Sequence, residues 1–362
     1  MKTIVFYIAT LTRGGAERVM VNLANYFVKQ DYRVLILTLE PDEGLYEIDT
    51  KVEHRVLTMP EDGGRISNAF GRITQVRRVL KEVQADALVS FIGKTNLRAI
   101  LAGLFTRTKV FVSVRSAPGR EYGSGLQRLL ARTLFYFADG CIFQTEQARD
   151  FFGEAVRKKS RIFYNALSGQ CIDKRYIGAR KPEIVTAGRM DPVKNHALLV
   201  DAFSLMVKEH PELTLTIYGD GDCMAAVKEQ AARLCLTDRI NLKGDCRDVP
   251  EQMKDAGVFV LSSDFEGMPN AVAEAMALGI PVVSTDCPSG GARALVHDGE
   301  TGLLVPVRDP GRMAEAVLRI LDDEALAQKL SDNGYAFSLT LHPDRIHRQW
   351  QNYIEEVCGL GV

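Results

Sequence analysis

The segment IVFYIATLTRGGAERVMVNLA (residues 4–24) begins with a short β-branched and aromatic run, passes through a pair of glycines and ends with apolar residues at helical spacing. This pattern predicts a buried strand, a glycine loop and a helix. Further apolar runs, with helical stretches between most of them, lie at residues 32–40, 53–59, 87–93, 109–114 and 140–145. Near-continuous apolar strands that alternate with helices indicate a parallel sheet covered on both faces.

The same pattern restarts in the second half of the chain. Strands are predicted at residues 184–188, 213–219, 240–244, 258–263 and 280–284, and helices after Asn195, from about Asp222 and from Pro269. A chain of 362 residues is longer than a single hydrophobic core usually grows. We therefore expect an α/β protein with two tandem Rossmann-like, doubly wound domains.

The predicted domains are residues 1–170 and 171–341, and a C-terminal helix over about 342–358 is expected to pack back on the first. In doubly wound sheets, ligands bind beyond the carboxyl ends of the strands. We expect the two domains to face each other across a deep cleft that binds ligands.

The formal net charge of -1 conceals an asymmetry between the two halves. Residues 1–165 contain 25 basic and 17 acidic residues, and between Arg65 and Arg161 the counts are 18 and 7. Such a surface attracts anions. We prefer an anionic membrane leaflet or a phosphorylated lipid to a merely solvated surface. Nucleic acid is not expected, because the sequence shows no pattern typical of nucleic-acid-binding modules.

The seven cysteines include no CxxC pair, which argues against a disulfide framework or a zinc site and fits a reducing cytoplasm. No apolar stretch approaches the roughly 18 to 20 residues that a membrane-spanning helix needs. We expect a cytoplasmic protein whose contact with the inner face of the membrane is peripheral.

The strongest motif is FEGMPNAVAEAMALG (residues 265–279). Pro269 suits the first helical position and Gly279 the residue after the helix, which places Glu266 in the preceding loop and Glu274 in the second turn. The amides of Asn270 and Ala271 would then offer a site for a diphosphate, and Glu274 could accept two hydrogen bonds from a ribose. The alternative is an amphipathic helix whose glutamates face water.

A second motif, AGRMDPVKN (residues 187–195), places Arg189 and Lys194 in one loop after a strand. Two permanent cations there could neutralise a diphosphate, as a divalent metal does in other enzymes. The alternative is a pair of surface cations, although a helix start disfavours cations unless an anion is bound there.

Three weaker signals remain. Gly14 and Gly15 would let backbone approach a ligand, although a plain tight turn would have the same sequence. The Asp220-Gly221-Asp222 triplet matches a metal-binding DxD pattern, but we expect no metal. Glu40 mimics the acidic residue that binds the ribose of NAD, but the loop after the first strand lacks G-x-G-x-x-G, so a dehydrogenase is not expected.

Taken together, GGAE (14–17), the Arg189 and Lys194 loop, GDG (219–221) and EGMPNAVAEAMA (266–277) resemble a retaining glycosyltransferase of family four, with the GT-B fold. The opening segment is similar to that of bacterial enzymes that extend polyprenyl-diphosphate-linked glycans. The resemblance implies metal-independent transfer without a cofactor, in which the product keeps the anomeric configuration of the donor.

The resemblance also implies roles for individual residues. Glu274 would hold the nucleotide ribose, and Glu266 the hydroxyls of the donor sugar. Arg189 and Lys194, beside Gly188, would bind the diphosphate. The other donor-binding residues that it implies are Gly14, Gly15, Asp245, Cys246, Arg247, Met268, Pro269, Asn270 and Ala271.

One position departs from the family pattern. Arg115 stands where many relatives have a histidine, and an arginine cannot act as an acid or base near neutral pH. It could still donate hydrogen bonds to a sugar or to an acceptor phosphate. Asn96, after another strand end, is a second expected neighbour of the acceptor.

The resemblance implies that the first domain binds an acceptor and the second a nucleotide sugar. It further implies transfer of a hexose or an N-acetylhexosamine from a UDP-sugar to a lipid-linked saccharide in surface polysaccharide or glycan biosynthesis. Two alternatives stay open: a sugar-nucleotide epimerase of the same fold, and a non-catalytic protein that binds a nucleotide sugar.

Overall fold

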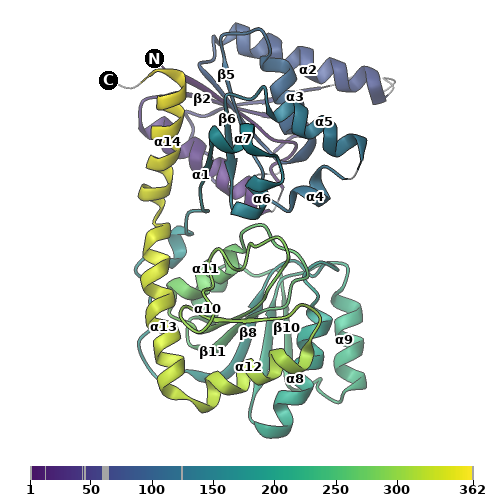
Figure 1. The fold of residues 1–362 in the computed structure, drawn as a ribbon. Helices are drawn as coiled ribbons and strands as arrows, with labels where there is room; N and C mark the ends of the chain where they lie inside the picture. Colours follow the sequence, from purple (N-terminus) through teal and green to yellow (C-terminus); the bar gives the residue numbers. More distant parts are fainter. Residues whose placement is uncertain are drawn as a thin grey trace. The chain divides into compact units, whose positions relative to one another are not determined.

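The computed structural model describes residues 2–12, 14–42, 44, 46–58, 65–123 and 125–360. The chain divides into two compact units, each built around one parallel sheet (Figure 1). The first unit is Met1–Asn165 with Asp344–Val362, and the second is Ala166–Pro343.

The sheet of the first unit has seven strands in the order β3-β2-β1-β4-β5-β6-β7. Its strands are β1 (Thr3–Tyr7), β2 (Arg33–Thr38), β3 (Glu53–Val56), β4 (Ala87–Phe91), β5 (Lys109–Ser113), β6 (Gly140–Phe143) and β7 (Ser160–Ile162). Its helices are α1 (Gly15–Lys29), α2 (Arg65–Glu82), α3 (Gly93–Gly103), α4 (Pro118–Glu121), α5 (Leu126–Phe135), α6 (Glu146–Asp150), α7 (Glu154–Lys158) and α14 (Pro343–Cys358).

Helices cover both faces of this sheet. On one face, buried side chains of α2, α3 and α5 pack against alternate residues of the strands, such as Tyr7, Leu88 and Val112. On the other face, α14 inserts Trp350, which is fully buried, with its ring 5.8 Å from Phe91 and 5.5 Å from Phe163 between centroids. The last helix of the chain is therefore part of the core of the first unit.

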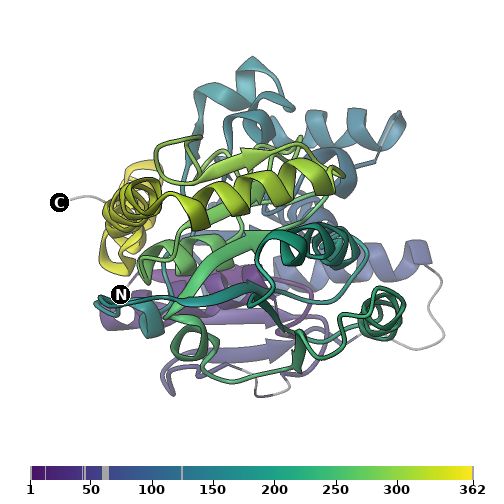
Figure 2. The ribbon, with the colours of Figure 1, turned by 90° about the horizontal axis from the view of Figure 1, so that it is seen from below.

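The sheet of the second unit has six strands in the order β10-β9-β8-β11-β12-β13. Its strands are β8 (Lys181–Ala187), β9 (Thr214–Tyr218), β10 (Ile240–Gly244), β11 (Ala256–Leu261), β12 (Val282–Thr285) and β13 (Leu303–Val305). Its helices are α8 (His196–Glu209), α9 (Met224–Arg233), α10 (Val249–Met253), α11 (Asn270–Ala277), α12 (Pro310–Asp322) and α13 (Glu324–Ser338). Helix α12 lies beside α8 and over the strands (Figure 2), and α11 packs on α13.

The predicted α/β class with two doubly wound sheets is confirmed. Two strands, β7 and β13, escaped prediction because each has only three residues and lies at a sheet edge, where pairing with a neighbour rather than an apolar run defines it. The prediction that Pro269 is the first helical residue is wrong. Pro269 has extended backbone (ψ 101°) and precedes the helix, which begins at Asn270.

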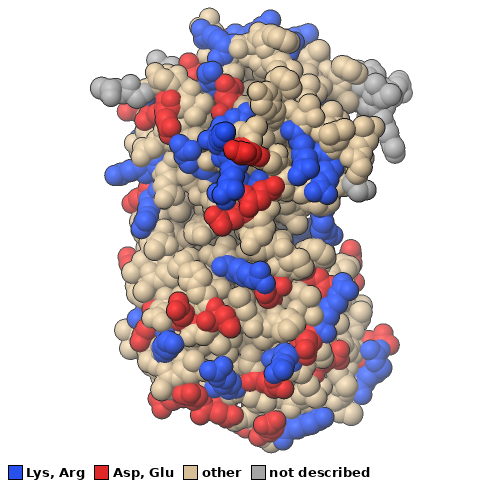
Figure 3. Space-filling view, viewed as in Figure 1, with Lys and Arg blue, Asp and Glu red and all other residues tan. Residues whose placement is uncertain are grey.

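No helix among the described residues is both long enough and apolar enough to cross a membrane. On the face shown in Figure 3, basic side chains gather on the first unit around a few acidic ones, and both signs intermingle on the second. This distribution follows the charge asymmetry of the sequence.

Replacement of Trp350 by alanine should destabilise the first unit by about 3–5 kcal/mol, because it removes a large side chain from between two other rings. Urea denaturation followed by circular dichroism measures the loss. Arg345→Ala, at an exposed position of the same helix, is the control and should change the free energy of unfolding little. An equal effect of both substitutions would contradict a core role for α14.

Candidate functional site

Each sheet has one place where the strand order reverses. In the second unit it lies between β8 and β11, and in the first between β1 and β4. Loops that leave two such neighbouring strands turn to opposite faces of the sheet and leave a crevice beyond the carboxyl ends. The Gly14 and Gly15 loop follows β1, the Arg189 and Lys194 loop follows β8, the Glu266 loop follows β11, and Asn96 lies in the helix after β4.

In the second unit, the loops after β8 and β11 bring together two charged residues 72 positions apart. Lys194 Nζ lies 2.6 Å from Glu266 Oε1. The hydroxyl of Ser263 donates to the same oxygen at 2.6 Å, and the amide of Glu266 donates to Ser289 Oγ at 3.3 Å. The side chains are 25% exposed for Lys194 and 10% for Glu266. The pair is therefore held in place yet open to solvent on one side.

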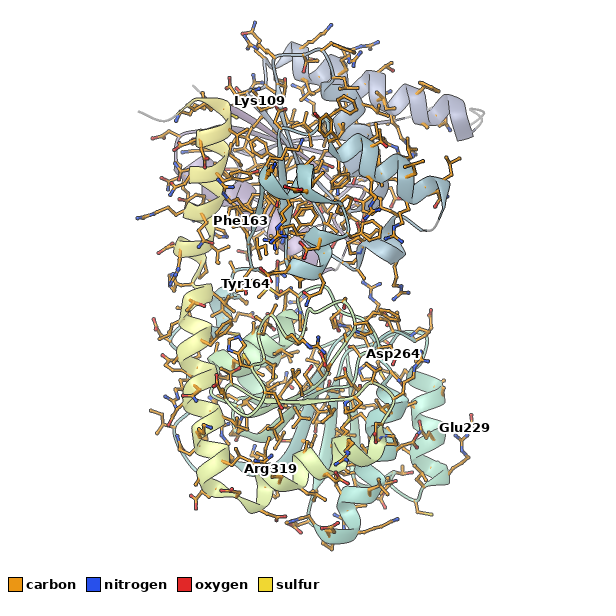
Figure 4. All side chains as sticks on the ribbon, in the orientation of Figure 1. Lys109, Phe163, Tyr164, Glu229, Asp264 and Arg319 are labelled. Atoms are coloured by element: carbon orange, nitrogen blue, oxygen red, sulfur yellow. The ribbon has the colours of Figure 1, made fainter. Side chains whose placement is uncertain are left out.

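Hydrogen bonds fix the loop that carries Lys194. Asp191 Oδ1 accepts from the amide of Lys194 at 3.1 Å, and Ser262 Oγ donates to the carbonyl of Lys194 at 2.8 Å. Asn195 caps α8 in a left-handed conformation, and its Nδ2 donates to Oδ1 of Asp264 at 3.2 Å. Asp264 is labelled in Figure 4. The two loops are thus tied to each other as well as to the sheet.

Close backbone contacts support the same loop from the side of β9. A side chain on Gly219 (φ 134°) would place its Cβ 2.0 Å from the carbonyl oxygen of Gly188. The amide of Met190 donates to the carbonyl of Asp220 at 2.8 Å. The GDG triplet therefore lets two loops touch through their backbones. The described residues contain no group of three or more His, Cys, Asp or Glu that could hold a metal.

Helix α11 is almost wholly buried. Only Asn270, Ala271 and Glu274 are partly exposed, and they lie on one face of its first two turns. Met268 and Pro269, before the helix, are buried. Glu274 is partly exposed on this face, and its contact with a ribose stays a prediction. The first amides of α11 have no partner carbonyl within the helix, as at every helix start.

The far end of α11 closes with a Schellman motif, because the amide of Gly279 (φ 72°) donates to Met276 and that of Ile280 to Ala275, both at 2.9 Å. The glycine expected after the helix is confirmed in that role.

The loop that carries three of the predicted donor-binding residues follows β10. Asp245 and Arg247 are exposed and Cys246 is half-buried. The carbonyl of Gly244, just before them, accepts from the amide of Gly219 at 2.8 Å. The loops after β10, β9, β8 and β11 are therefore neighbours along one edge of the sheet, in that order.

In the first unit, Gly14 caps α1, and Gly15 is the first helical residue. The amide of Gly14 donates to the hydroxyl of Tyr46 at 2.8 Å, and its carbonyl accepts from the same hydroxyl at 2.9 Å. A Cβ on Gly14 would lie 2.1 Å from a carboxylate oxygen of Glu17. A larger residue here would therefore require the end of the Glu17 side chain to move.

Arg115 follows β5 and is buried. Its Nη1 donates to Asn165 Oδ1 at 2.7 Å, and its guanidinium lies 4.2 Å from the ring centre of Phe91 and 5.3 Å from that of Trp350. Burial lowers the pKa of Arg115 to about 9, which still leaves it charged at neutral pH. Its contact with a sugar or phosphate stays a prediction.

Asn96, in α3, is fully buried and ties that helix to its neighbours. Its Nδ2 donates to the carbonyl of Ser113 at 2.9 Å and to the hydroxyl of Tyr122 at 3.1 Å. The structure thus gives this side chain a packing role, and its contact with an acceptor stays a prediction.

The sequence interpretation did not include Ser263, Ser289 or Tyr46. Ser289 lies in CPSGG (residues 287–291), a glycine-containing loop after a predicted strand, and this signal could have identified it. No local pattern marks Tyr46, whose contact with Gly14 depends on the fold.

Two family models match the chain: "Glycosyltransferase Family 4" over residues 13–168 and "Glycosyl transferases group 1" over residues 181–323. A Campylobacter jejuni α-1,4-N-acetyl-D-galactosaminyltransferase, named for a diNAcBac-PP-undecaprenol-linked glycan, is 25% identical over 99% of this chain and 99% of its own. An uncharacterised glycosyltransferase of Haemophilus influenzae is 25% identical over 98% of this chain and all of its own.

Solved structures share the fold. Anabaena HepE in complex with UDP has a TM-score of 0.82 and 20% identity, over 98% of this chain and all of its own. Sucrose-phosphate synthase from Thermosynechococcus elongatus has a TM-score of 0.84 and 18% identity, over all of both chains.

The pH dependence of stability should report on His196, the first residue of α8. Burial, helped by the charge of Lys194, lowers the pKa of His196 to about 4 from 6.5. Between pH 6.5 and about 4, His196 therefore binds a proton in the unfolded chain but not in the folded chain. The free energy of unfolding should fall by up to about 3 kcal/mol as the pH drops toward 4. His196→Leu should remove this part of the slope. Denaturation curves across that range measure it, and equal slopes would contradict the assignment.

Proposed function

The chain belongs to the family-4 glycosyltransferases with the GT-B fold, and on this basis we propose that it transfers a sugar from a UDP-sugar to a lipid-linked saccharide. The observation that carries the proposal is the Lys194–Glu266 contact at the strand-order reversal of the second sheet, in the same unit as the partly exposed face of α11. A fixed cation and a helix start suit a diphosphate, and carboxylates suit the hydroxyls of sugars.

The donor and acceptor follow from the relatives. Anabaena HepE was solved with UDP and with UDP-glucose, which supports a uridine nucleotide. Two Campylobacter relatives of 25% identity are named as N-acetylgalactosaminyltransferases acting on diphospho-undecaprenol-linked glycans, which supports an N-acetylhexosamine or hexose and a polyprenyl-diphosphate acceptor. The product would enter surface polysaccharide or glycan biosynthesis.

The proposed chemistry begins with an exchange of partners. When the donor binds, the diphosphate replaces Glu266 as the partner of Lys194, and Glu266 is released to accept hydrogen bonds from the sugar. Lys194 and Arg189 then stabilise the charge that grows on the diphosphate as the bond to the sugar breaks. Glu274 accepts from the ribose hydroxyls.

We propose that transfer retains the anomeric configuration. The leaving diphosphate takes the proton of the acceptor hydroxyl on the face where the new bond forms, so that no nucleophile is needed from the protein. Proton NMR of the product of a single transfer would show the configuration, and inversion would contradict this part of the proposal.

Replacement of Lys194 by alanine should lower kcat about 10²- to 10³-fold, because a cation aimed at developing charge is lost. Release of UDP from the UDP-sugar measures turnover. Lys208→Ala, which removes an exposed cation from α8, is the matched control and should retain activity. A Lys194→Ala enzyme with an unchanged kcat would refute the proposed role.

Activity should persist in excess EDTA, since Arg189 and Lys194 supply the positive charge that a divalent metal supplies in other enzymes. The assay compares dialysed enzyme with and without chelator. Loss of activity that returns with Mg²⁺ or Mn²⁺ would contradict metal independence but not glycosyl transfer itself.

A further inference from the structure

The described part of the first unit exposes its large apolar side chains unevenly. Every such side chain lies on the layer of α2, α3 and α5 or in the turns that follow α3 and α5, and none lies on α1 or α14. The exposed side chains are Phe70, Phe105, Leu126, Leu129, Leu130, Tyr136 and Phe137. Single exposed apolar residues are ordinary, but a cluster marks a surface that meets something apolar.

Five of these seven side chains belong to α5 or to the turn that follows it. We call Leu126, Leu129, Leu130, Tyr136 and Phe137 the outer stripe of α5; these side chains are between 50% and 81% exposed. Positions 126, 129, 130 and 137 recur at helical spacing, so they share one face of the helix and of the turn that continues it.

The outer stripe lies opposite the face that holds α5 on the protein. Of its side chains, Tyr136 contacts Lys159, whose Nζ lies 5.5 Å from the ring centre. The inner face holds the helix through Ala131 and Phe135, which are fully buried. The ring of Phe135 stacks on that of Phe152 at 4.1 Å and meets that of Tyr122 at 5.5 Å. Because α5 is anchored on this inner face, the apolar character of the outer stripe is not explained by folding.

Positive charge flanks the outer stripe. Arg128 and Arg132 lie on α5 with their guanidinium groups 4.6 and 5.5 Å from the ring centre of Phe151, and α5 contains no acidic residue. Between Arg98 and Phe137 the sequence has seven basic residues and one acidic residue, Glu121. In Figure 3, blue side chains lie beside the tan surface at the right of the first unit, where Figure 1 places α5.

We propose that the outer stripe of α5 docks on an anionic phospholipid bilayer, with its apolar side chains in the headgroup layer and Arg128 and Arg132 against the lipid phosphates. Apolar residues on one helical face with basic residues at its side are the composition of helices that lie in a membrane interface. Aromatic side chains, here Tyr136 and Phe137, favour the same depth. Charge complementarity selects an anionic lipid surface over a second copy of this chain, whose corresponding surface is also basic.

The inference rests on the proposed function, because a lipid-linked acceptor requires the enzyme to work at a bilayer. Docking itself can be measured without acceptor or donor. Failure of the two proposals can therefore be told apart.

The test is sedimentation with vesicles of phosphatidylcholine alone and of phosphatidylcholine mixed with phosphatidylglycerol in equal parts. The full-length protein should bind the mixed vesicles, and less so as salt is raised. Leu126→Gln with Leu130→Gln should weaken binding at least about ten-fold, because two apolar side chains no longer enter the interface. The matched control, Ile177→Gln with Leu339→Gln, changes two exposed apolar residues of the second unit and should bind as the wild type does.

A second assay uses a water-soluble, short-chain analogue of the diphosphate-linked acceptor. The α5 variant should turn it over at the wild-type rate in the absence of vesicles. If no enzyme form accepts the analogue while vesicle binding follows the prediction, the proposed function fails and the docking surface stands.

Three results would overturn the docking proposal. In the first, the wild-type protein does not bind anionic vesicles. In the second, the α5 variant binds them as well as the wild type does. In the third, the wild type forms a concentration-dependent dimer in solution and the α5 variant does not. The last result would make the outer stripe a subunit interface.

Discussion

The contact between Lys194 and Glu266 depends on most of the second unit. It requires β8 and β11 to be neighbours, so that loops far apart in the sequence leave the same edge of the sheet. It also requires Gly219 to have no side chain, because a Cβ there would displace the carbonyl of Gly188. The contact fixes a cation and a carboxylate at the strand-order reversal, and charged groups held in fixed positions are what electrostatic stabilisation of a reaction requires.

The first unit contains a buried arginine that packs on aromatic rings. Arg115 is buried against two aromatic rings and bonded to Asn165, the last residue before the chain passes into the second unit. One of those rings belongs to Trp350 on α14, after the chain has returned. The guanidinium of Arg115 thus contacts residues from both parts of the first unit, Met1–Asn165 and Asp344–Val362.

Helix α5 shows how one element can serve two environments. Its inner face supplies Phe135 to the core, and its outer stripe leaves large apolar side chains in water beside arginines. Such a helix gains little for folding from its outer face. Large apolar side chains are exposed on the layer of α2, α3 and α5 but not on α1 or α14. The first unit therefore has one surface suited to an anionic, partly apolar partner.

The sequence alone was enough to predict the class of fold and the places of the main motifs relative to strands and helices. Apolar residues recur at the spacings of strands and of helices. Gly279 and Asn195 mark helix ends through local backbone requirements. It was also enough to place Glu266 in a loop and Glu274 in the second turn of a helix. These are local properties, decided within a few residues.

Only the tertiary structure decided which side chains meet. The hydroxyls of Ser263 and Ser289 around Glu266, the tyrosine behind Gly14, the burial of Asn96 and the edge strands β7 and β13 depend on segments distant in the chain. The outward face of α5 also depends on the tertiary structure. Apolar residues at helical spacing do not show which of the two apolar faces of the helix will pack on the core. The physical reason is that strand order and helix docking are set by the packing of the whole sheet, which no local stretch of residues encodes.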